Sequence, residues 1–253
     1  AEADPTFDVE GLDAAHKLSI LASIAFGIPL QFDKVYTEGI TKITREDVEY
    51  AEQLGYRIKH LGIAKRTDNG IEMRVHPTLI PEKRLIANVD GVMNAVLVKG
   101  DTVGPTLYYG AGAGADAIAS AVVADIVDVV RMLTSDPENR VPHLAFQADA
   151  LSDVPILSME EVTTAYYLKM QAMDKPGVLA DVTKILGKRN ISIEAMIQKE
   201  PAGSFSEEER TATIIMLTGN VIEGAMNQAI KDIEALDTIE DSVTRIRMEQ
   251  LSR

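Results

Sequence analysis

Apolar residues in the first third of this chain are spaced first as in helices and then as in strands. An almost unbroken apolar run over 14–26 predicts a buried helix, with Asp13 as its N-cap and Gly27 as its C-cap. A second helix is expected to begin at Thr44, because Thr44 and Asp47 have the spacing of a capping box. Both helices precede the part of the chain that is expected to form a sheet.

Alternating residues over 56–109 predict two pairs of strands. The segments 56–66 and 71–80 flank the turn Asp68-Asn69-Gly70, a combination typical of a β-hairpin. A second pair is expected around Gly100-Asp101. A glycine-rich turn from Gly110 then leads into a long apolar helix. The face of this helix that is spaced for burial comprises Ile118, Val122, Ile126, Val129 and Val130.

The last ninety residues alternate between strand-like and helical spacing in the order β-α-β-β-α-β, which is typical of ferredoxin-like domains. Before them, residues 134–163 carry prolines and scattered charges without a sustained period. They are interpreted as a linker, with a packed irregular loop inside a single domain as the alternative. The sequence therefore predicts an α+β protein with a first domain over 1–133, a linker over 134–163 and a second domain over 164–253.

Composition excludes several classes of function. Lys and Arg number 25 against 39 Asp and Glu, and the net charge of −14 argues against binding to nucleic acid or anionic lipid. The chain has no cysteine, so disulfides and thiolate chemistry are excluded, and its four histidines lack metal-ligand spacing. No apolar run approaches the roughly 18 residues of a membrane span, and the first residues are acidic, unlike a signal peptide. A cytoplasmic protein without a metal site is expected.

One acidic cluster near the first residue has the chemistry of a small-molecule site. Glu2, Asp4, Asp8 and Asp13 lie within twelve residues, and Lys17 follows Asp13 by one helical turn. Carboxylates accept hydrogen bonds from an ammonium group, and a lysine among apolar neighbours can have a lowered pKa suited to proton transfer. Ordinary helix capping with a salt bridge between Asp13 and Lys17 explains the same residues.

The spacing of this cluster resembles the signature of homoserine dehydrogenases. The matching pattern is Asp4-Pro5-x-x-Asp8-Val9-x-Gly11-x-Asp13-x-x-x-Lys17, and the segments 38–40, 94–96 and 110–123 also resemble that family in order and spacing. The resemblance implies a catalytic domain in which helices cover a sheet. It also implies NAD(P)-dependent interconversion of L-homoserine and L-aspartate 4-semialdehyde, an oxidoreductase step in threonine, methionine and isoleucine biosynthesis.

The resemblance also implies roles for individual residues. Glu2 and Asp13 would bind the amino and hydroxyl groups of homoserine, with Asp8 supporting them. Lys17 would donate and accept the proton at the substrate oxygen while hydride passes to or from the nicotinamide of NADP or NAD. By itself the glycine-rich turn before the long helix is only a weak indication of dinucleotide binding. By resemblance it borders the nicotinamide end of the cofactor cleft, where the candidates are Gly112 and Gly114.

The chain departs from that family in one large respect. The dinucleotide-binding domain with which homoserine dehydrogenases begin has no counterpart in this sequence. Such a segment, on the order of 150 residues, would be one ordinary domain. We therefore expect this polypeptide to be a fragment that binds little of the cofactor and does not turn over alone. The residues that would choose between NAD and NADP are not in it.

The last domain resembles an ACT domain. The pattern is Asp174-Lys175-Pro176-Gly177-Val178-Leu179 before a helix whose first turn suits Pro176, with Asn190-Ile191 after it. The resemblance implies side-by-side pairing and an amino-acid effector, threonine in the dehydrogenases that carry it. Its binding residues would be Asp174, Gly177, Val178, Leu179, Asn190 and Ile191.

Two interpretations of the whole chain remain open. The first is the substrate-binding and regulatory part of a homoserine dehydrogenase that forms a dimer or tetramer, with the apolar strands at 92–109 and the ACT edges favouring self-association. The second is a non-catalytic amino-acid-sensing module in which the first region only dimerises and Pro176-Gly177 merely turns the chain.

Overall fold

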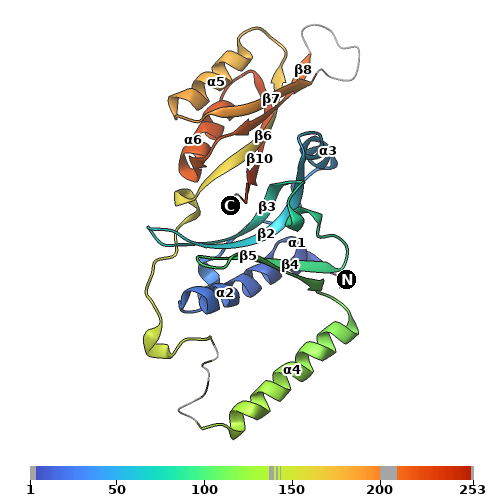
Figure 1. Cartoon of the computed structure of the whole chain (residues 1–253). Helices are drawn as coiled ribbons and strands as arrows, with labels where there is room; N and C mark the ends of the chain where they lie inside the picture. The colour runs from blue at the N-terminus through green and yellow to red at the C-terminus, as the bar shows by residue number, and fades with distance from the viewer. Residues whose placement is uncertain (1–3, 137–139, 141, 143, 200–209, 252–253) are drawn as a thin grey trace.

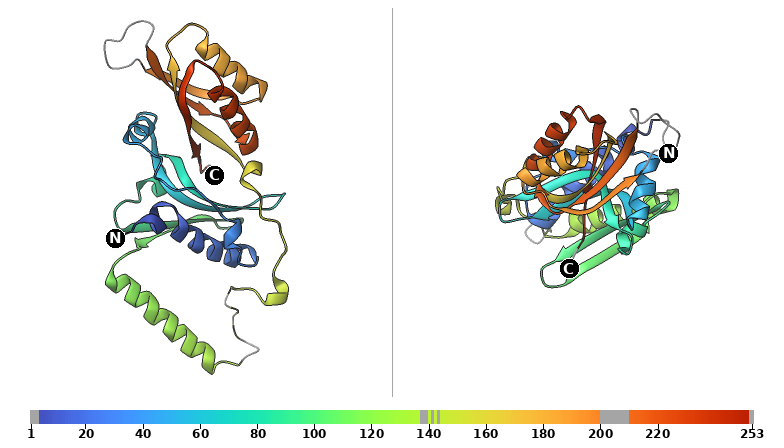
Figure 2. Two further views of the ribbon diagram at one scale, coloured as in Figure 1. Left: turned by 180° about the vertical axis from the view of Figure 1, so that it is seen from behind. Right: turned by 90° about the horizontal axis from the view of Figure 1, so that it is seen from above.

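A computed structural model describes residues 4–136, 140, 142, 144–199 and 210–251 of the chain. Figure 1 shows two units stacked end to end, with the second unit uppermost, and one long helix that lies apart from both. The view from behind in Figure 2 shows the same separation of that helix. In the part of the chain that is described, no helix combines the length and apolar character that crossing a membrane requires.

The first unit is built on a long hairpin, as the alternation over 56–80 predicts. Strands β2 and β3 pair antiparallel over their full length, from Tyr56↔Pro81 to Arg66↔Ile71. Every residue of β3 is buried, because both faces of this strand are covered. The elements of this unit are α1 (Thr6–Val9), α2 (Leu12–Phe26), β1 (Tyr36–Thr37), α3 (Arg45–Gln53), β2 (Tyr56–Arg66) and β3 (Ile71–Pro81). The described 3₁₀ turns of the chain are Phe32–Lys34, Leu85–Asn88, Ala148–Ala150 and Met159–Glu161.

The ends of the first helices follow local signals, with one correction. Gly27 closes α2 in the left-handed conformation, and Thr44 caps α3 in a capping box with Asp47, as predicted. The prediction that Asp13 caps α2 is wrong. Gly11, at φ +80°, is the N-cap, because a left-handed residue lets the chain turn directly from α1 into α2. Asp13 is therefore the second residue of the helix.

The second strand pair and the long helix lie on the side of the first unit that faces away from the second unit (Figure 1). Strands β4 (Met93–Gly100) and β5 (Gly104–Ala111) form the separate hairpin that was expected. The helix α4 (Ala115–Thr134) contains no buried residue, so the prediction that its apolar face is buried is wrong. The spacing is that of a covered face, but no described segment packs on it. The exposed side chains include Ile118, Val122, Ile126, Val129 and Val130.

The second unit has the predicted β-α-β-β-α-β order. Its elements are β6 (Thr163–Met173), α5 (Val178–Lys188), β7 (Ile193–Lys199), β8 (Thr211–Thr218), a short β9 (Val221–Ile222), α6 (Glu223–Glu234) and β10 (Ile239–Met248). The strands lie in the order β10-β6-β8-β7 and are antiparallel throughout. Both helices pack on one face of this sheet, where Leu168, Val182 and Met226 belong to a continuous core. The prediction that Pro176 lies in the first turn of α5 is wrong, because Pro176 precedes the N-cap residue Gly177.

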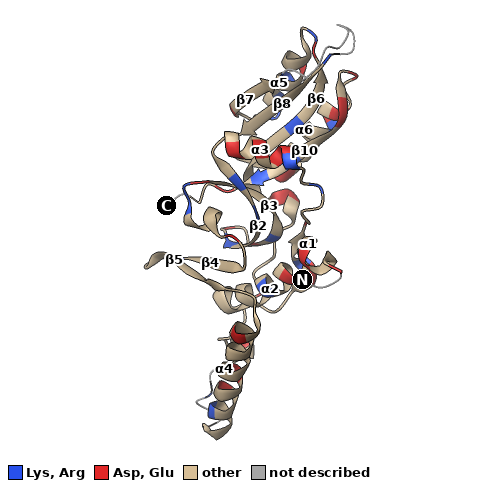
Figure 3. Cartoon of the chain, turned by 90° about the vertical axis from the view of Figure 1, so that its right-hand side faces the viewer, with Lys and Arg blue, Asp and Glu red and all other residues tan. Residues whose placement is uncertain are grey.

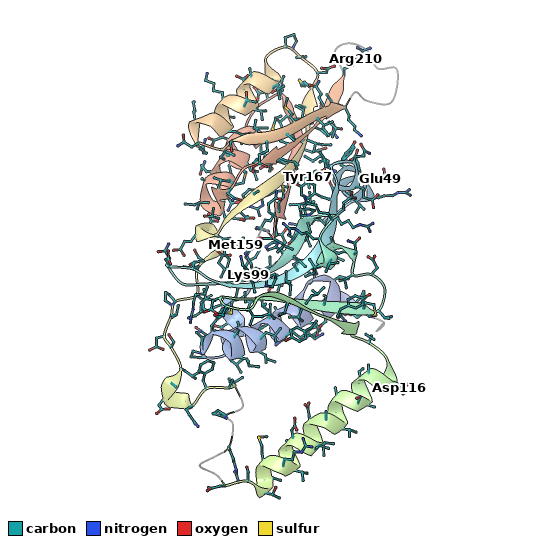
Figure 4. All side chains as sticks on the ribbon, viewed as in Figure 1. Glu49, Lys99, Asp116, Met159, Tyr167 and Arg210 are labelled. Atoms are coloured by element: carbon teal, nitrogen blue, oxygen red, sulfur yellow. The ribbon has the colours of Figure 1, made fainter. Side chains whose placement is uncertain are left out.

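The other face of this sheet packs against the first unit. Tyr167 of β6, Ile215 of β8 and Leu79 of β3 share one buried cluster with Ala51 of α3. Figure 4 labels Tyr167 in this layer, and its hydroxyl donates a 3.4 Å hydrogen bond to the Asp47 carboxylate of α3. The two units therefore share an apolar core as well as a linker.

The sheets of the two units also join through their backbones. Strand β10 pairs parallel with β3 at Arg247↔Thr78 and Met248↔Leu79, which makes one sheet in the order β1-β3-β10-β6-β8-β7. Strand β10 of the second unit thereby pairs with the part of the β3 edge that β1 does not cover.

Residues 152–157 of the expected linker lie along the first unit, whereas the turn Met159–Glu161 contacts α6 of the second unit. The Ile71 amide donates a 2.9 Å hydrogen bond to the Pro155 carbonyl, and the Leu157 amide donates one of the same length back to Ile71. Val154 and Ile156 pack on the core that α2 forms with β3. The domain boundaries stay a prediction, and this part of the linker is packed rather than free of the first unit.

Candidate active site

The acidic cluster lies on α1, α2 and the single turn between them. Asp8 is exposed on α1, and Asp13 and Lys17 occupy the first turns of α2, with Gly11 as the joint. The ring of Phe7 on α1 stacks on His16 of α2 at 5.8 Å between centroids, which holds the two helices together. Figure 3 colours the charged residues of these two helices. Glu2 lies outside the described residues.

Asp13 and Lys17 form the pair that the spacing predicted. The Lys17 ammonium donates a 2.5 Å hydrogen bond to the Asp13 carboxylate. The side chain of Lys17 is 70% exposed and that of Asp13 is 38% exposed, so both groups are open to a molecule that approaches α2 from solvent. The apolar surroundings expected of Lys17 are not supplied by the described residues. The pair offers a proton donor and a hydrogen-bond acceptor side by side.

Asp4 has a local structural role. Its carboxylate accepts hydrogen bonds from the amide and the hydroxyl of Thr6, at 3.0 and 2.6 Å. The hydroxyl bond and then the amide bond lower the pKa of Asp4, because both stabilise the charged carboxylate. Asp4 thus holds the start of α1, while Asp8, with its side chain exposed, is free to meet a ligand.

The turn at Gly11 is fixed by close packing. A Cβ at this position would lie 2.8 Å from Cε1 of His60 and 2.9 Å from Val75, and the backbone has a φ of +80°. A side chain would be both crowded and strained there. The segment that carries Asp8 and Asp13 therefore rests closely on β2 and β3, although its charged groups face solvent.

Gly112 and Gly114 lie where β5 gives way to α4. Gly112 is packed, since a Cβ would lie 1.3 Å from the Asn94 side-chain amide, whereas Gly114 is the N-cap of α4 at φ +119° with open space where a Cβ would be. The first turn of α4 is exposed, so its backbone amides are accessible beside this turn. A phosphate or amide group could approach them without meeting a side chain at Gly114.

The effector candidates divide between the two ends of α5. Asp174 and Gly177 lie before the helix, where Gly177 caps it at φ +97° with open space at its Cβ position. Asn190 lies after it, roughly 17 Å away at the rise of an α-helix. Val178 and Ile191 are buried in the core and Leu179 packs against it, so these three offer mainly backbone groups to a ligand. One chain does not bring all six candidates together.

A buried cluster of charges at the junction of the units was missed in the sequence. Arg247 of β10 donates to both carboxylate oxygens of Glu223, at 2.9 and 2.5 Å, and to Glu38 at 2.7 Å. Beside it, Arg74 contacts Glu72, Glu249 and His76. The signal was present in β3, because a strand buried on both faces that carries Glu72, Arg74 and His76 on one face must pair these groups internally.

The electrostatics of this junction follow from its burial. Burial alone would raise the pKa of Glu38, but the charge and hydrogen bond of Arg247 outweigh it and lower that pKa. Burial, followed by the charges of Arg247 and Arg74, holds the pKa of His76 well below its usual value. Nε2 of His76 lies 2.8 Å from an Arg74 nitrogen that can only donate, so the neutral ring is the one that fits.

Metal-ligand geometry is not found in the described part of the chain, where no three His, Asp or Glu side chains are grouped to hold an ion.

Comparison with protein families divides the chain as its fold does. A family described as homoserine dehydrogenase matches residues 1–127, and the ACT domain family matches residues 166–235. These spans contain the acidic cluster and the β-α-β-β-α-β unit, respectively.

Individual relatives match the whole chain. A homoserine dehydrogenase of Pseudomonas aeruginosa is 66% identical over 252 residues, and one of Neisseria gonorrhoeae is 55% identical over 251. These alignments cover 100% and 99% of this chain, which spans 57% of the length of each relative.

Two solved structures share the fold. A homoserine dehydrogenase from Thiobacillus denitrificans superposes with a TM-score of 0.92 at 65% identity, covering 100% of this chain and 56% of that one. A homoserine dehydrogenase of S. aureus at pH 6.0 gives a TM-score of 0.66 at 27% identity, covering 100% of this chain and 57% of that one.

Proposed function

The chain belongs to the homoserine dehydrogenase family, and from that membership we propose that it forms the substrate-binding and regulatory part of such an enzyme. The reaction is the NAD(P)-dependent interconversion of L-homoserine and L-aspartate 4-semialdehyde. The observation that carries the proposal is the exposed Asp13–Lys17 pair on a helix whose start is fixed at Gly11. Turnover requires a nucleotide-binding domain in addition to these 253 residues.

The groups of this site match the needs of the reaction. Asp13, with Asp8 in support, accepts hydrogen bonds from the substrate and thereby orients it. When the aldehyde is reduced, the Lys17 ammonium gives its proton to the carbonyl oxygen, and in the reverse direction its amine takes the hydroxyl proton. A nicotinamide cofactor, when bound, would supply hydride to the aldehyde carbon or receive it from the hydroxyl-bearing carbon. Glu2, which precedes that sequence pattern by two residues, would by resemblance complete the cluster as a ligand for the substrate amino group.

The glycine turn before α4 fits the approach of a nicotinamide cofactor. Gly114 leaves open space beside the first turn of α4, and Gly112 allows the Asn94 amide to pack against the backbone. These features would let a cofactor amide or phosphate reach backbone N–H groups. NAD and NADP share the nicotinamide end, so this contact serves either cofactor.

The test is an assay of the chain joined to the nucleotide-binding domain of a homoserine dehydrogenase. We expect oxidation of NADH or NADPH with aspartate semialdehyde, and a fall in kcat of roughly 10²- to 10⁴-fold in Lys17→Ala. Lys34→Ala is a matched control, because Lys34 is also an exposed lysine with one local partner, Gln31. It should retain the parent rate.

Two outcomes would contradict the assignment. An undiminished rate in Lys17→Ala would remove this lysine from proton transfer. A joined protein that binds amino acids without any turnover would favour the alternative, a non-catalytic amino-acid-sensing dimerisation module, in which Lys17 has no chemical task.

For the ACT unit, the proposal is a site for a threonine-like amino acid between two copies of the chain. Asp174 and Gly177 at one end of α5 and Asn190 at the other are too far apart to meet on one molecule. Both ends are exposed, and β7 is an edge strand that a second copy can approach. A carboxylate would bind at the first turn of α5, where Gly177 leaves the backbone amides open.

Titration calorimetry of the 253-residue chain with L-threonine tests this site. We expect binding that Gly177→Val abolishes and that Asn220→Ala, a change at an exposed residue after β8, leaves intact. Sedimentation velocity should report a dimer or larger homo-oligomer. A chain that remains monomeric and releases no heat with threonine or related amino acids would refute the proposal.

A further inference from the structure

The edge of β3 is shared by two strands from opposite ends of the chain. β1 runs parallel to its first half, with Thr37 opposite Val75, and β10 runs parallel to its second half, with Arg247 opposite Thr78. The Glu38 amide continues the first pairing with a 2.8 Å hydrogen bond to the Val75 carbonyl. The end of β1 therefore meets β10 along one edge, which places Glu38 beside Arg247.

Arg247 is held between an element of each unit. Its side chain is 1% exposed; Glu223, which it binds with two hydrogen bonds, is 2% exposed, and Glu38 is 27% exposed. The Tyr36 hydroxyl accepts a further hydrogen bond from Arg247 at 3.1 Å and donates one to Glu38 at 2.8 Å. A planar guanidinium with several donors suits this position, because it contacts three acceptors in fixed directions.

Glu38 is the first residue of a segment, 38–41, that contacts the turn between α1 and α2. Its carbonyl lies 2.9 Å from Nε2 of His60, the ring on which Gly11 rests. A Cβ on Gly39 would lie 2.8 Å from Cα of Glu10, so the two backbones are in close contact. The Ile40 amide then donates a 2.9 Å hydrogen bond to the Val9 carbonyl.

The hydroxyl of Thr41 adds a last contact, a 3.1 Å hydrogen bond to the Glu10 carboxylate. The segment 38–41, called the clamp below, thus contacts residues 9–11, and His60 of β2 and Val75 of β3 also pack against Gly11. Residues 9–11 lie between Asp8 and Asp13, so a displacement of this clamp would move both carboxylates relative to each other.

We propose that Arg247, a residue of the ACT unit, is a positioning residue for the substrate site, acting through Glu38 and the clamp 38–41 on the turn that separates Asp8 from Asp13. Arg247 does not touch the substrate. It fixes the end of β1, and the clamp transmits that fixed position to the carboxylates. The role in catalysis rests on the proposed function, whereas the clamp itself is a property of this chain.

Amide hydrogen exchange in the 253-residue chain tests the clamp without any catalysis. In Arg247→Met the Ile40 amide should exchange at least about threefold faster, and Glu38→Gln should act in the same direction while keeping an acceptor for Arg247. Arg245→Met is the matched control. Among the described contacts, Arg245 forms an ion pair with Glu223 and a hydrogen bond with Asn227, but neither a hydrogen bond nor an ion pair with Glu38. Its Ile40 exchange should match that of the parent.

The joined enzyme tests the consequence for the substrate. Arg247→Met and Glu38→Gln should raise KM for aspartate semialdehyde by about 2- to 30-fold, with a smaller change in kcat, and the double variant should not exceed the larger single effect. Arg245→Met should keep the parent KM.

The outcomes separate the two proposals. Loss of stability in Arg247→Met with unchanged Ile40 exchange and unchanged KM in both variants would overturn the positioning role. If Arg247→Met does not fold, Glu38→Gln decides by the same two readouts. Faster exchange together with a joined parent protein that never turns over would support the clamp and refute the proposed function instead.

Discussion

Two ion pairs in this molecule use the same chemistry in opposite surroundings. Lys17 and Asp13 form an exposed pair one helical turn apart on α2, whereas Arg247 and Glu223 form a pair at the junction of the units that is almost completely buried. The first is local in sequence. The second also reaches Glu38, more than two hundred residues earlier in the chain.

The difference separates groups that are free to react from groups that hold the fold. An exposed pair within one helix contributes only a few tenths of a kcal/mol, so its members can rearrange around a substrate at little cost. A buried pair has lost its water, and each member depends on the other. We infer that the exposed pair of Asp13 and Lys17 is available for the proposed chemistry, whereas the buried pair of Arg247 and Glu223 fixes the position of the segments that carry it.

The largest expected effect would break the buried side of this comparison. Arg247→Met should lower the free energy of unfolding by about 3–5 kcal/mol, because Glu223 loses its buried cationic partner and Glu38 loses its ion pair. Among the described residues Glu223 would keep the partly exposed Arg245 and the Tyr166 hydroxyl. Urea unfolding of the 253-residue chain, followed by circular dichroism, measures the loss. A decrease below about 1 kcal/mol would show that this pair is no more important to the fold than a surface pair.

A pH titration sharpens the same comparison with an effect of intermediate size. The pKa of His76 is well below 6.5 in the fold, where it faces Arg74, Arg247 and His60, so the neutral ring is the native form. As the pH falls below 6.5 the unfolded chain takes up a proton that the folded chain does not, and stability is lost. The free energy of unfolding should decrease by about 1.4 kcal/mol between pH 7.5 and 5.5 from this group.

His76→Gln is the control for that titration, because it removes the titrating ring and keeps an acceptor for Arg74. The variant should be less stable at every pH and should lose this part of the slope. An unchanged slope between pH 7.5 and 5.5 would assign the pH dependence to other groups.

The smallest effect concerns the exposed side of the comparison. Lys17→Met should change the free energy of unfolding by no more than about 0.5 kcal/mol, since it removes only an exposed i,i+4 pair. Urea unfolding beside the parent measures it. The same residue is expected to be critical for turnover, so a stability loss of 2 kcal/mol or more would contradict the division between reactive and structural charges.

The parts of the fold that sequence predicted depend on neighbours in the chain. The capping box of Thr44 and Asp47, the C-cap at Gly27 and the hairpin of β2 and β3 are set by residues a few positions apart, and all three are confirmed. The acidic pattern was also visible, because Asp13 and Lys17 are one helical turn apart and the structure pairs them as expected.

The parts that sequence did not predict depend on distant partners. The pairing of Arg247 with Glu38 was not predicted, since nothing in the sequence near either residue shows that β10 lies against β3. The apolar spacing of α4 predicted a buried face, but α4 has no buried residue. A periodic pattern shows that a helix face is suited to burial, but it does not show which segment would cover that face. Local spacing predicts elements, and long-range pairing decides which charges become structural.

The parallel pairing of β10 with β3 also sets the order in which this chain can be completed on the ribosome. Leu79 emerges early, but its partner Met248 emerges about 10–30 s later at typical rates of synthesis. During that interval the second half of the β3 edge has no strand beside it, and an unpaired edge is a template for association with other chains. This stretch of the β3 edge can therefore be paired only after β10 has been made. A nascent chain halted before β10 should need a chaperone that binds extended strands.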